Sequence, residues 1–297
     1  MKLVVIAGAT ATGKSSLSVE LAQAIDAEII NADSMQVYRG MDIGTAKITL
    51  EERQGIPHHM LDVLDVNQDS TVAWYQSGAR EVIDEIHSRG KSVVMVGGTG
   101  LYIKAVIDEL NFPDTDPMVR HTLNKEAEDL GIDAMFARLE KLDPAAAIAI
   151  DRANLRRIIR ALEVIEITGK AFTANLPREE SIRYPDARQF GLVMDRELLS
   201  ERIDQRVNTM FENGFVEEVQ KLMSSGLLEG RTAQRALGYS QIVSHLKGET
   251  SLDAAIEETK RATRQYARRQ ETWFSRDARI KWISTRQPRL ETILESL

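Results

Sequence analysis

Cysteine is absent from the 297 residues. This absence excludes disulfides, cysteine-ligated zinc and a thiol nucleophile, and it agrees with a reducing compartment. No segment approaches the ~18 consecutive apolar residues that a membrane-spanning helix requires. Met1 and Lys2 lead directly into an apolar segment rather than into a signal peptide. We therefore expect a soluble, cytoplasmic protein with no membrane partner.

Positive charge is in deficit over the whole chain, which carries a formal net charge of −7 at pH 7. Such a balance ordinarily argues against a nucleic-acid partner. The charge is uneven, however, because Lys260 to Arg289 holds ten lysines and arginines against only Glu271 and Asp277. The distribution of charge matters more than its sum, so a basic face on an acidic protein is expected.

The most specific motif present is GATATGKS, residues 8 to 15, which fits the phosphate-loop pattern GxxxxGK[ST]. It follows the apolar, β-branched run Leu3 to Ala7 and precedes a helical pattern from Leu17 to Ile25, so the context argues against a chance match. Backbone N–H groups and a helix start together bind di- or polyphosphates. Lys14 is expected along the phosphate oxygens and the Ser15 hydroxyl on Mg²⁺. The predicted phosphate-binding residues are Gly8, Ala9, Thr10, Ala11, Thr12, Gly13, Lys14 and Ser15.

Two further buried strands end in polar or glycine-rich segments. Ala27 to Asn31 is followed by Asp33 to Tyr38, and Ser92 to Val96 is followed by the turn Gly97 to Gly100, which opens a helix. In an open parallel sheet, ligands bind at the carboxyl ends of the strands. Both segments should therefore face the same crevice as the phosphate loop.

The composition changes at residues 113 to 117, Pro-Asp-Thr-Asp-Pro, and helical patterns without a convincing strand follow. Within them, Asp151 to Ile167 is the strongest predicted helix. Strand character returns at Phe190 to Met194, and the chain continues with helices at 197–213, 216–224 and 252–274 and a strand at 280–283. The predicted fold is α/β with a parallel sheet, a helical insertion and a helical C-terminal part. The predicted domains are residues 1–115 with 186–297, and residues 116–185.

Seven motifs, in this order, resemble those of the bacterial tRNA dimethylallyltransferases, and they span essentially the whole chain. They are residues 8–15, 33–38 (DSMQVY), 44–47 (GTAK), 57–59 (PHH), 97–102 (GGTGLY), 160–163 (RALE) and 265–274 (QYARRQETWF).

The resemblance implies transfer of a dimethylallyl group from dimethylallyl diphosphate to the exocyclic amine of the adenosine 3′ of the anticodon, with Mg²⁺. It also implies a nucleotide-kinase-like phosphate-loop core whose helical insertion helps to hold the anticodon stem-loop of tRNA. Eukaryotic relatives add a zinc finger, which a chain without cysteine does not contain. We further expect a monomer.

In this reaction the phosphate loop would stabilise the leaving pyrophosphate. A carboxylate must accept the proton of the weakly nucleophilic adenine amine, and Asp33 is the only acid in a motif at the crevice. The resemblance gives the matching Asp this role and places the Thr99 hydroxyl on the target nucleotide, so the predicted catalytic residues are Asp33, Thr99 and Lys14. Arg202 and Arg206, one helical turn apart, are candidate pyrophosphate ligands. The predicted tRNA-binding residues are Asp33, Ser34, Met35, Gln36, Thr99, Arg120, Arg156, Arg157, Ile158, Ile159 and Arg160.

Several of these residues have a structural alternative. Asp33 could cap a helix or hold Mg²⁺ through water, and the Arg157 and Arg160 side could be a solvated helix face. Two adjacent histidines cannot share a ligand face on a strand, so His58 and His59 are interpreted as hydrogen-bonded structural residues. The aromatic residues that we expect in the core are Trp273, Phe274 and Trp282.

Three other functions are alternatives to tRNA modification. A small-molecule or nucleotide kinase shares the phosphate loop, although the strand Val93 to Val96 ends in glycines and not in a Mg²⁺-binding Asp. A prenyltransferase acting on free adenine nucleotides is the second. The third is an RNA-binding or GTPase-like module, disfavoured by the absence of an Asn-Lys-x-Asp motif.

Overall fold

A six-stranded parallel sheet forms the centre of the protein in the computed structural model, which describes residues 1–175 and 181–297. The strand order is β3-β2-β4-β1-β5-β6, and every pair of neighbours is parallel. The predicted α/β class is thus confirmed. The strands are β1 (Leu3–Gly8), β2 (Ala27–Asn31), β3 (His58–His59), β4 (Ser92–Gly97), β5 (Arg188–Val193) and β6 (Ile280–Ser284).

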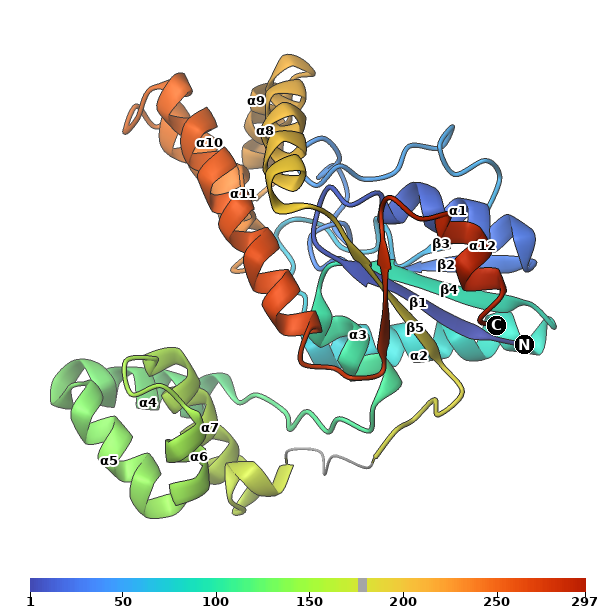
Figure 1. Cartoon of the computed structure of the whole chain (residues 1–297). Helices are drawn as coiled ribbons and strands as arrows, with labels where there is room; N and C mark the ends of the chain where they lie inside the picture. Colours follow the sequence, from blue (N-terminus) through green and yellow to red (C-terminus); the bar gives the residue numbers. More distant parts are fainter. Residues whose placement is uncertain (176–180) are drawn as a thin grey trace. The chain divides into compact units, whose positions relative to one another are not determined.

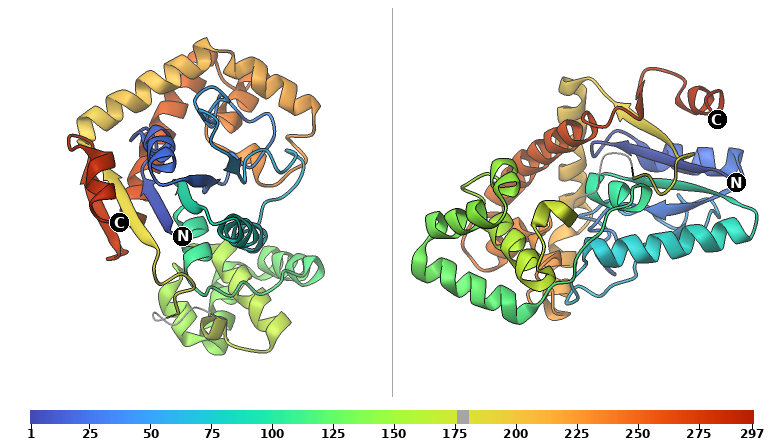
Figure 2. Two further views of the ribbon diagram at one scale, coloured as in Figure 1. Left: turned by 90° about the vertical axis from the view of Figure 1, so that its right-hand side faces the viewer. Right: turned by 90° about the horizontal axis from the view of Figure 1, so that it is seen from below.

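Helices cover both faces of this sheet (Figures 1 and 2). On one face, α1 (Lys14–Ala24) and α12 (Arg289–Leu294) pack around Leu17, Ile283 and Ile293. On the other, α2 (Val72–Ser88) and α3 (Gly100–Ile107) pack together, with the Tyr75 and Tyr102 rings stacked 3.9 Å apart. All six β1 residues are buried because this strand lies between two others and under both helical layers.

A second group of helices belongs to the same unit as the sheet. It consists of α8 (Arg196–Glu212), α9 (Phe215–Ser224), α10 (Tyr239–Leu246) and α11 (Leu252–Phe274), with the 3₁₀ turn η2 (Ala233–Arg235). Its own core includes Phe215 and Tyr239, whose rings meet edge to face at 4.9 Å. The helices α8 and α11 lie side by side (Figure 1). None of the described helices is long and apolar enough to cross a membrane.

The chain divides into two compact units, Met1–Ile107 with Tyr184–Leu297, and Asp108–Arg183. The boundaries therefore lie earlier than the expected 115/116 and 185/186. The second unit contains α4 (Pro117–Leu130), α5 (Ile132–Leu142), α6 (Pro144–Ala149), α7 (Leu155–Thr168) and the 3₁₀ turn η1 (Phe172–Asn175). It has a separate apolar core that includes Leu123, Leu139 and Leu162.

Two details of the sequence prediction were wrong. The strongest insertion helix begins at Leu155 and not at Asp151, because the Asn154 side chain accepts the Arg157 N–H at 3.2 Å and caps it there. Phe274 is buried, but Trp273 and Trp282 are 39% and 40% exposed. Each of these indoles lies over a glycine, Gly100 or Gly191, where a Cβ atom would clash with the ring.

Candidate active site

The phosphate loop connects the end of β1 to the start of α1, as predicted. Gly13 has φ 85°, a left-handed conformation that favours glycine, and no described side chain caps the start of α1. The Lys14 ammonium and the Thr12 hydroxyl both donate to the Ala9 carbonyl, at 2.6 and 2.8 Å. The first-turn N–H groups of α1 and the Lys14 side chain therefore meet at the carboxyl end of β1, which is an anion-binding arrangement.

A cavity of about 920 Å³ opens at this end of the sheet. Its lining joins residues from the phosphate loop, the segment after β2, the turn after β4, and helices α8 and α11. Among the predicted site residues, those lining it are Thr10, Ala11, Gly13, Lys14, Ser15, Asp33, Gln36, Arg202 and Arg206. The sequence separation of these residues shows that the fold, and not local sequence, assembles the site.

Charges of both signs meet in the cavity. Burial and, to a lesser extent, the neighbouring Arg206 lower the pKa of Lys14 to about 8, although the Asp33 carboxylate opposes both effects. Burial also lowers the pKa of Arg206, again opposed by Asp33. Arg206 donates to the Thr10 hydroxyl at 3.2 Å, whereas Arg202 is exposed at the lining. Two cations held together at a phosphate loop are arranged for a highly charged anion.

The Asp33 segment is fixed by short-range hydrogen bonds. Asn31 accepts from Asp33 N at 3.1 Å and donates to the Asp33 and Met60 carbonyls at 3.0 Å each. The Asp33 Oδ1 atom accepts the Met35 N–H at 2.9 Å, so the carboxylate closes a turn while it lines the cavity. Asp33 thus caps a turn, and no helix begins there in the structure; this hydrogen bond does not preclude a chemical role.

The turn after β4 is joined to this segment by Thr99. Its hydroxyl accepts the Ser34 N–H at 3.0 Å and donates to the Ser34 hydroxyl at 3.3 Å. The turn passes so close to the end of β2 that a Cβ on Gly97 would lie 2.2 Å from the Ala32 carbonyl oxygen. Thr99, Ser34 and Met35 themselves are not among the residues lining the cavity. Thr99 therefore connects the two strand ends.

Glu218 of α9 supports the cavity and was missed by the sequence analysis. Its carboxylate accepts three backbone N–H groups, from Asp42, Ile43 and Gly44, at 2.7 to 3.2 Å. The Tyr239 hydroxyl donates to it at 2.6 Å, and burial beside this carboxylate raises the pKa of Tyr239.

The segment that Glu218 holds presents the Thr45 carbonyl, which accepts from Gln36 at 3.0 Å and from Arg206 at 3.4 Å. The same segment ends at Lys47, whose ammonium donates to the Tyr38 carbonyl at 2.7 Å and to the Asp42 and Asp62 carboxylates at 2.7 and 2.5 Å. The motif at residues 44 to 47 is thus a support for two cavity residues, a role that its sequence alone did not reveal.

The two histidines are structural, as interpreted. His58 Nδ1 lies 2.8 Å from the Ile56 carbonyl, and His59 Nε2 lies 2.7 Å from the Glu28 carboxylate. Burial lowers the pKa of His58. No group of three or more metal-ligating side chains occurs among the described residues.

In the helical unit, the predicted tRNA-binding residues fall into three sets. Ile158 and Ile159 are buried in its apolar core, so their side chains are not presented to a ligand. Arg120 and Arg160 both pair with the fully buried Glu163. Arg160 also donates to the Pro113 and Asp114 carbonyls.

The third set, Arg156 and Arg157, is exposed on α7. Of the four predicted arginines, these two are exposed, whereas Arg120 and Arg160 are partly buried. Among these four arginines, Arg156 and Arg157 are the best placed to meet an external anion.

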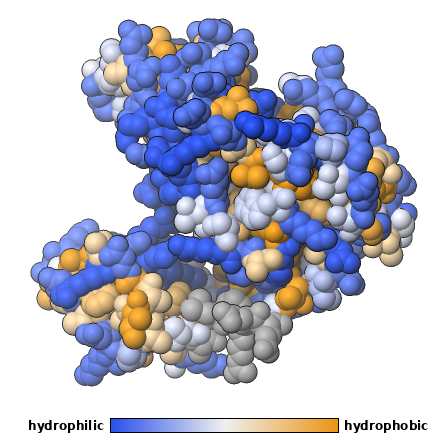
Figure 3. Space-filling view, viewed as in Figure 1, coloured by the Kyte–Doolittle hydropathy of each residue, from blue (hydrophilic) through white to orange (hydrophobic). Residues whose placement is uncertain are grey.

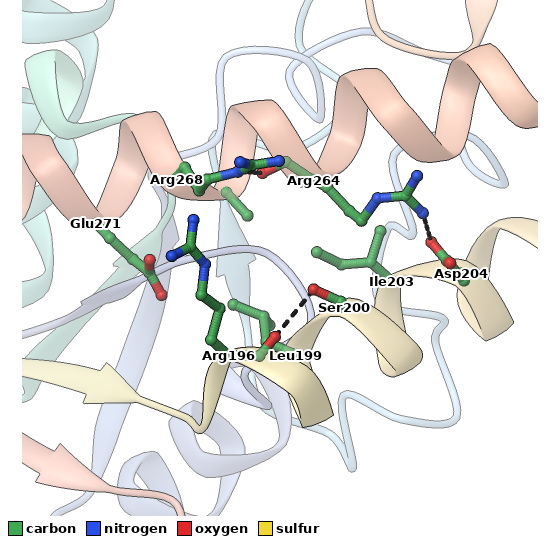
Figure 4. A pocket seen from close by; sticks show the side chains of 9 residues that line it. Arg196, Leu199, Ser200, Ile203, Asp204, Arg264, Arg268 and Glu271 are labelled. Carbon is green, nitrogen blue, oxygen red and sulfur yellow. Dashed lines mark hydrogen bonds and ion pairs between the residues drawn. The ribbon is translucent and has the colours of Figure 1, made fainter.

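Helices α8 and α11 enclose a second, smaller cavity of about 450 Å³. Three arginines project into it, Arg196 from α8 and Arg264 and Arg268 from α11 (Figure 4). Arg264 pairs with Asp204, and Glu271 lies at the other end. The surface over these helices is predominantly hydrophilic (Figure 3). The basic stretch of the sequence is therefore at least partly neutralised by acids on neighbouring turns and helices.

The fold and the loop together define a phosphate-loop protein with an α/β core and a helical insertion. The family model "IPP transferase" matches residues 36–277. The tRNA dimethylallyltransferase of Thermobifida fusca is 55% identical over 293 residues, which cover 97% of this chain and 91% of the relative. The chain thus belongs to the IPP transferase family.

Solved structures agree with this assignment. The tRNA isopentenylpyrophosphate transferase of Bacillus halodurans is 42% identical, with a TM-score of 0.73, over 99% of this chain and 94% of that one. A eukaryotic dimethylallyltransferase described as acting on tRNA is 30% identical, with a TM-score of 0.81, over 96% of this chain and 74% of that one.

Proposed function

We propose that this protein transfers a dimethylallyl group from dimethylallyl diphosphate to N6 of the tRNA adenosine 3′ of the anticodon, position 37, and releases pyrophosphate. The observation that carries the proposal is the convergence of Lys14, Arg206 and Asp33 in one cavity at the phosphate loop. Cations suited to a diphosphate and a carboxylate suited to an amine proton are the two requirements of this reaction. Membership of the family supports the same chemistry.

The phosphate loop acts on the leaving group. As the allylic C–O bond breaks, negative charge develops on the diphosphate, and Lys14, Arg206 and the amides at the start of α1 stabilise it. Arg202, at the exposed rim of the cavity, is a candidate for the outer phosphate. The loop therefore accelerates departure of pyrophosphate without receiving a phosphoryl group.

Divalent-metal use follows from this substrate, and Mg²⁺ is the proposed ion. Mg²⁺ is typically held by one or two protein oxygens together with phosphate oxygens and water. The exposed Ser15 hydroxyl, at the start of α1 on the cavity lining, fits the protein's share of that set. The ion would add positive charge at the diphosphate oxygens.

Asp33 is the proposed general base. The adenine amine is a poor nucleophile because its lone pair is delocalised, so a carboxylate must take its proton as the N–C bond forms. The base itself is proposed to leave the RNA stack and lie beside Gln36, whose amide can pair with an adenine edge. Thr99 and Ser34 hold the segment that presents both groups.

The helical unit is the proposed tRNA surface. Exposed Arg156 and Arg157 on α7 are suited to backbone phosphates, whereas Arg120 and Arg160 contribute mainly by fixing their helices through Glu163. A single chain is proposed to act on the anticodon stem-loop, in the cytoplasm.

The test is incubation of the protein with labelled dimethylallyl diphosphate, Mg²⁺ and either an anticodon stem-loop or AMP, followed by mass spectrometry of the nucleosides. Prenylated adenosine is expected in the RNA alone, and a stem-loop with guanosine at position 37 is the matched control. Label in AMP but not in RNA would assign the protein to free-nucleotide prenylation. Label in neither acceptor would refute the proposal.

A further inference from the structure

We propose that Gln270 is a positioning residue for the diphosphate site, holding the phosphate loop against the turn after β4. The side chain is 5% exposed and comes from α11. Its Oε1 atom accepts the Thr10 N–H at 2.9 Å, and its Nε2 atom donates to the Gly98 carbonyl at 2.9 Å. One amide thus joins two loops that follow different strands of the sheet.

The packing around this amide leaves little freedom. A Cβ atom on residue 98 would lie 2.1 Å from Gln270 Nε2, so the close approach requires the glycine that is found there. The Thr10 N–H is satisfied by the protein and so is not needed by a ligand. The bond instead fixes the orientation of the Ala9–Thr10 peptide, and the carbonyl of this same peptide, that of Ala9, receives the Lys14 ammonium.

Neighbouring contacts extend the support to the acceptor side. Tyr266, one turn earlier on α11, lies beside Thr99 and Gln270, and burial raises its pKa to about 12. Thr99 in turn accepts the Ser34 N–H. The buried face of α11 therefore holds both halves of the cavity, and Gln270 is the member that touches the phosphate loop directly.

Gln270 acts through backbone groups, so its predicted effect is selective. Removing its amide leaves a buried N–H and a buried carbonyl unpaired, and the loop should relax to satisfy them. A displaced loop loses affinity for diphosphate. Binding of RNA by the exposed side chains of α7 does not depend on this bond.

The experiment compares Gln270→Met, which keeps the volume but removes both hydrogen bonds, with Gln265→Met on the exposed side of the same helix. Pyrophosphate affinity is measured by calorimetry without RNA, and KM is measured for each substrate. We expect Gln270→Met to raise the pyrophosphate Kd and the KM for dimethylallyl diphosphate by ~10-fold or more, as for a buried group left unpaired. The stem-loop KM should change less than about twofold, and Gln265→Met should match the wild type.

A second variant, Gln270→Asn, retains the amide but withdraws it by one methylene, so it can reach only one of the two turns. An intermediate pyrophosphate Kd is expected, and this variant decides the question if Gln270→Met does not fold. Unchanged pyrophosphate affinity in a folded variant, or equal increases in both KM values, would overturn the inference. The inference rests on the proposed function only for its KM values, since the calorimetric assay needs no acceptor and no turnover.

Discussion

Lys14 gives the site a pH dependence of its own. Burial and Arg206 bring its pKa down to about 8, so the ammonium is charged below this pH and is lost as the pH rises through it. The charged form binds diphosphate. Pyrophosphate affinity, measured by calorimetry between pH 6.5 and 9.5, should therefore weaken above pH 8.

Titration of pyrophosphate itself also contributes to the dependence of affinity on pH. The variant Lys14→Arg isolates this contribution, because its guanidinium stays charged over the whole pH range. Lys14→Ala should bind weakly across the range, with a loss of ~10²-fold or more in transfer rate. An identical pH profile for the wild type and Lys14→Arg would contradict the assignment of the titration to Lys14.

A substitution of Asp33 can distinguish its two candidate roles, that of a general base and that of a metal ligand. Asp33→Asn keeps the Oδ1 atom that accepts the Met35 N–H, so the turn should persist while basicity is lost. We expect single-turnover transfer to fall by ~10² to 10⁴-fold, with near-normal affinity for the stem-loop and for pyrophosphate. The assay is run at several Mg²⁺ concentrations. Rescue by added Mg²⁺, or a defect confined to pyrophosphate binding, would make Asp33 a metal residue.

Site residues could be predicted where they belong to a contiguous sequence motif. Lys14 and Ser15 belong to one loop, and Asp33 directly follows an apolar strand. Glu218 lies in no motif, and Gln270 belongs to the motif at residues 265–274 without indicating a role. Each acts on backbone groups far away in the sequence, Glu218 on Ile43 and Gln270 on Thr10. Ile158 and Ile159 were included among the predicted RNA-binding residues, although their side chains lie in the apolar core of the helical unit, as expected for an apolar pair on an amphipathic helix.

At the scale of the helix, α7 carries the clearest prediction about RNA. Exchanging both exposed arginines, Arg156→Glu with Arg157→Glu, should weaken stem-loop binding and lower the slope of log affinity against log salt by about two, one per phosphate contact. Arg160 is left unchanged because a glutamate there would face buried Glu163. Filter binding from 50 to 300 mM salt provides the slope.

The matched control places the same charge change elsewhere in the helical unit, at exposed Lys125→Glu with Lys141→Glu. If the control lowers the slope as much as the α7 variant, then net charge and not the α7 surface governs binding. An unchanged slope for the α7 variant would identify Arg156 and Arg157 as part of a solvated helix face.

Buried strands and helices with strong periodicity were predicted well, and the shortest helices were not. Helix α11 was predicted with its observed bounds, 252–274, because its apolar side recurs over 23 residues. Helices α10 and α12 have only eight and six residues, which is too short for a pattern to stand out. Tertiary packing, as of Tyr239 and Ile293 in two different cores, supports these short elements instead.

The whole molecule consists of a phosphate-loop unit interrupted by a helical unit with its own core. The chain leaves the first unit and returns to it at adjacent points, because the Tyr184 N–H donates to the Ile107 carbonyl at 3.2 Å. Sequence composition located this insertion approximately, since the proline-rich change at 113 lies a few residues inside it. The boundary itself depends on contacts between distant residues and could not be read from composition.

This geometry makes the helical unit removable. Replacing Asp108–Arg183 by a short Gly-Ser linker should leave the sheet and its helices folded, because the two chain ends that the linker must join are adjacent. The shortened protein should unfold cooperatively on heating and bind pyrophosphate within about threefold of the wild type, since every described residue of that cavity lies in the first unit. Stem-loop affinity should fall by at least ~10-fold through the lost arginine contacts. Loss of pyrophosphate binding in a cooperatively folded deletion variant would show that the helical unit contributes to the diphosphate site, and undiminished stem-loop affinity would remove it from RNA recognition.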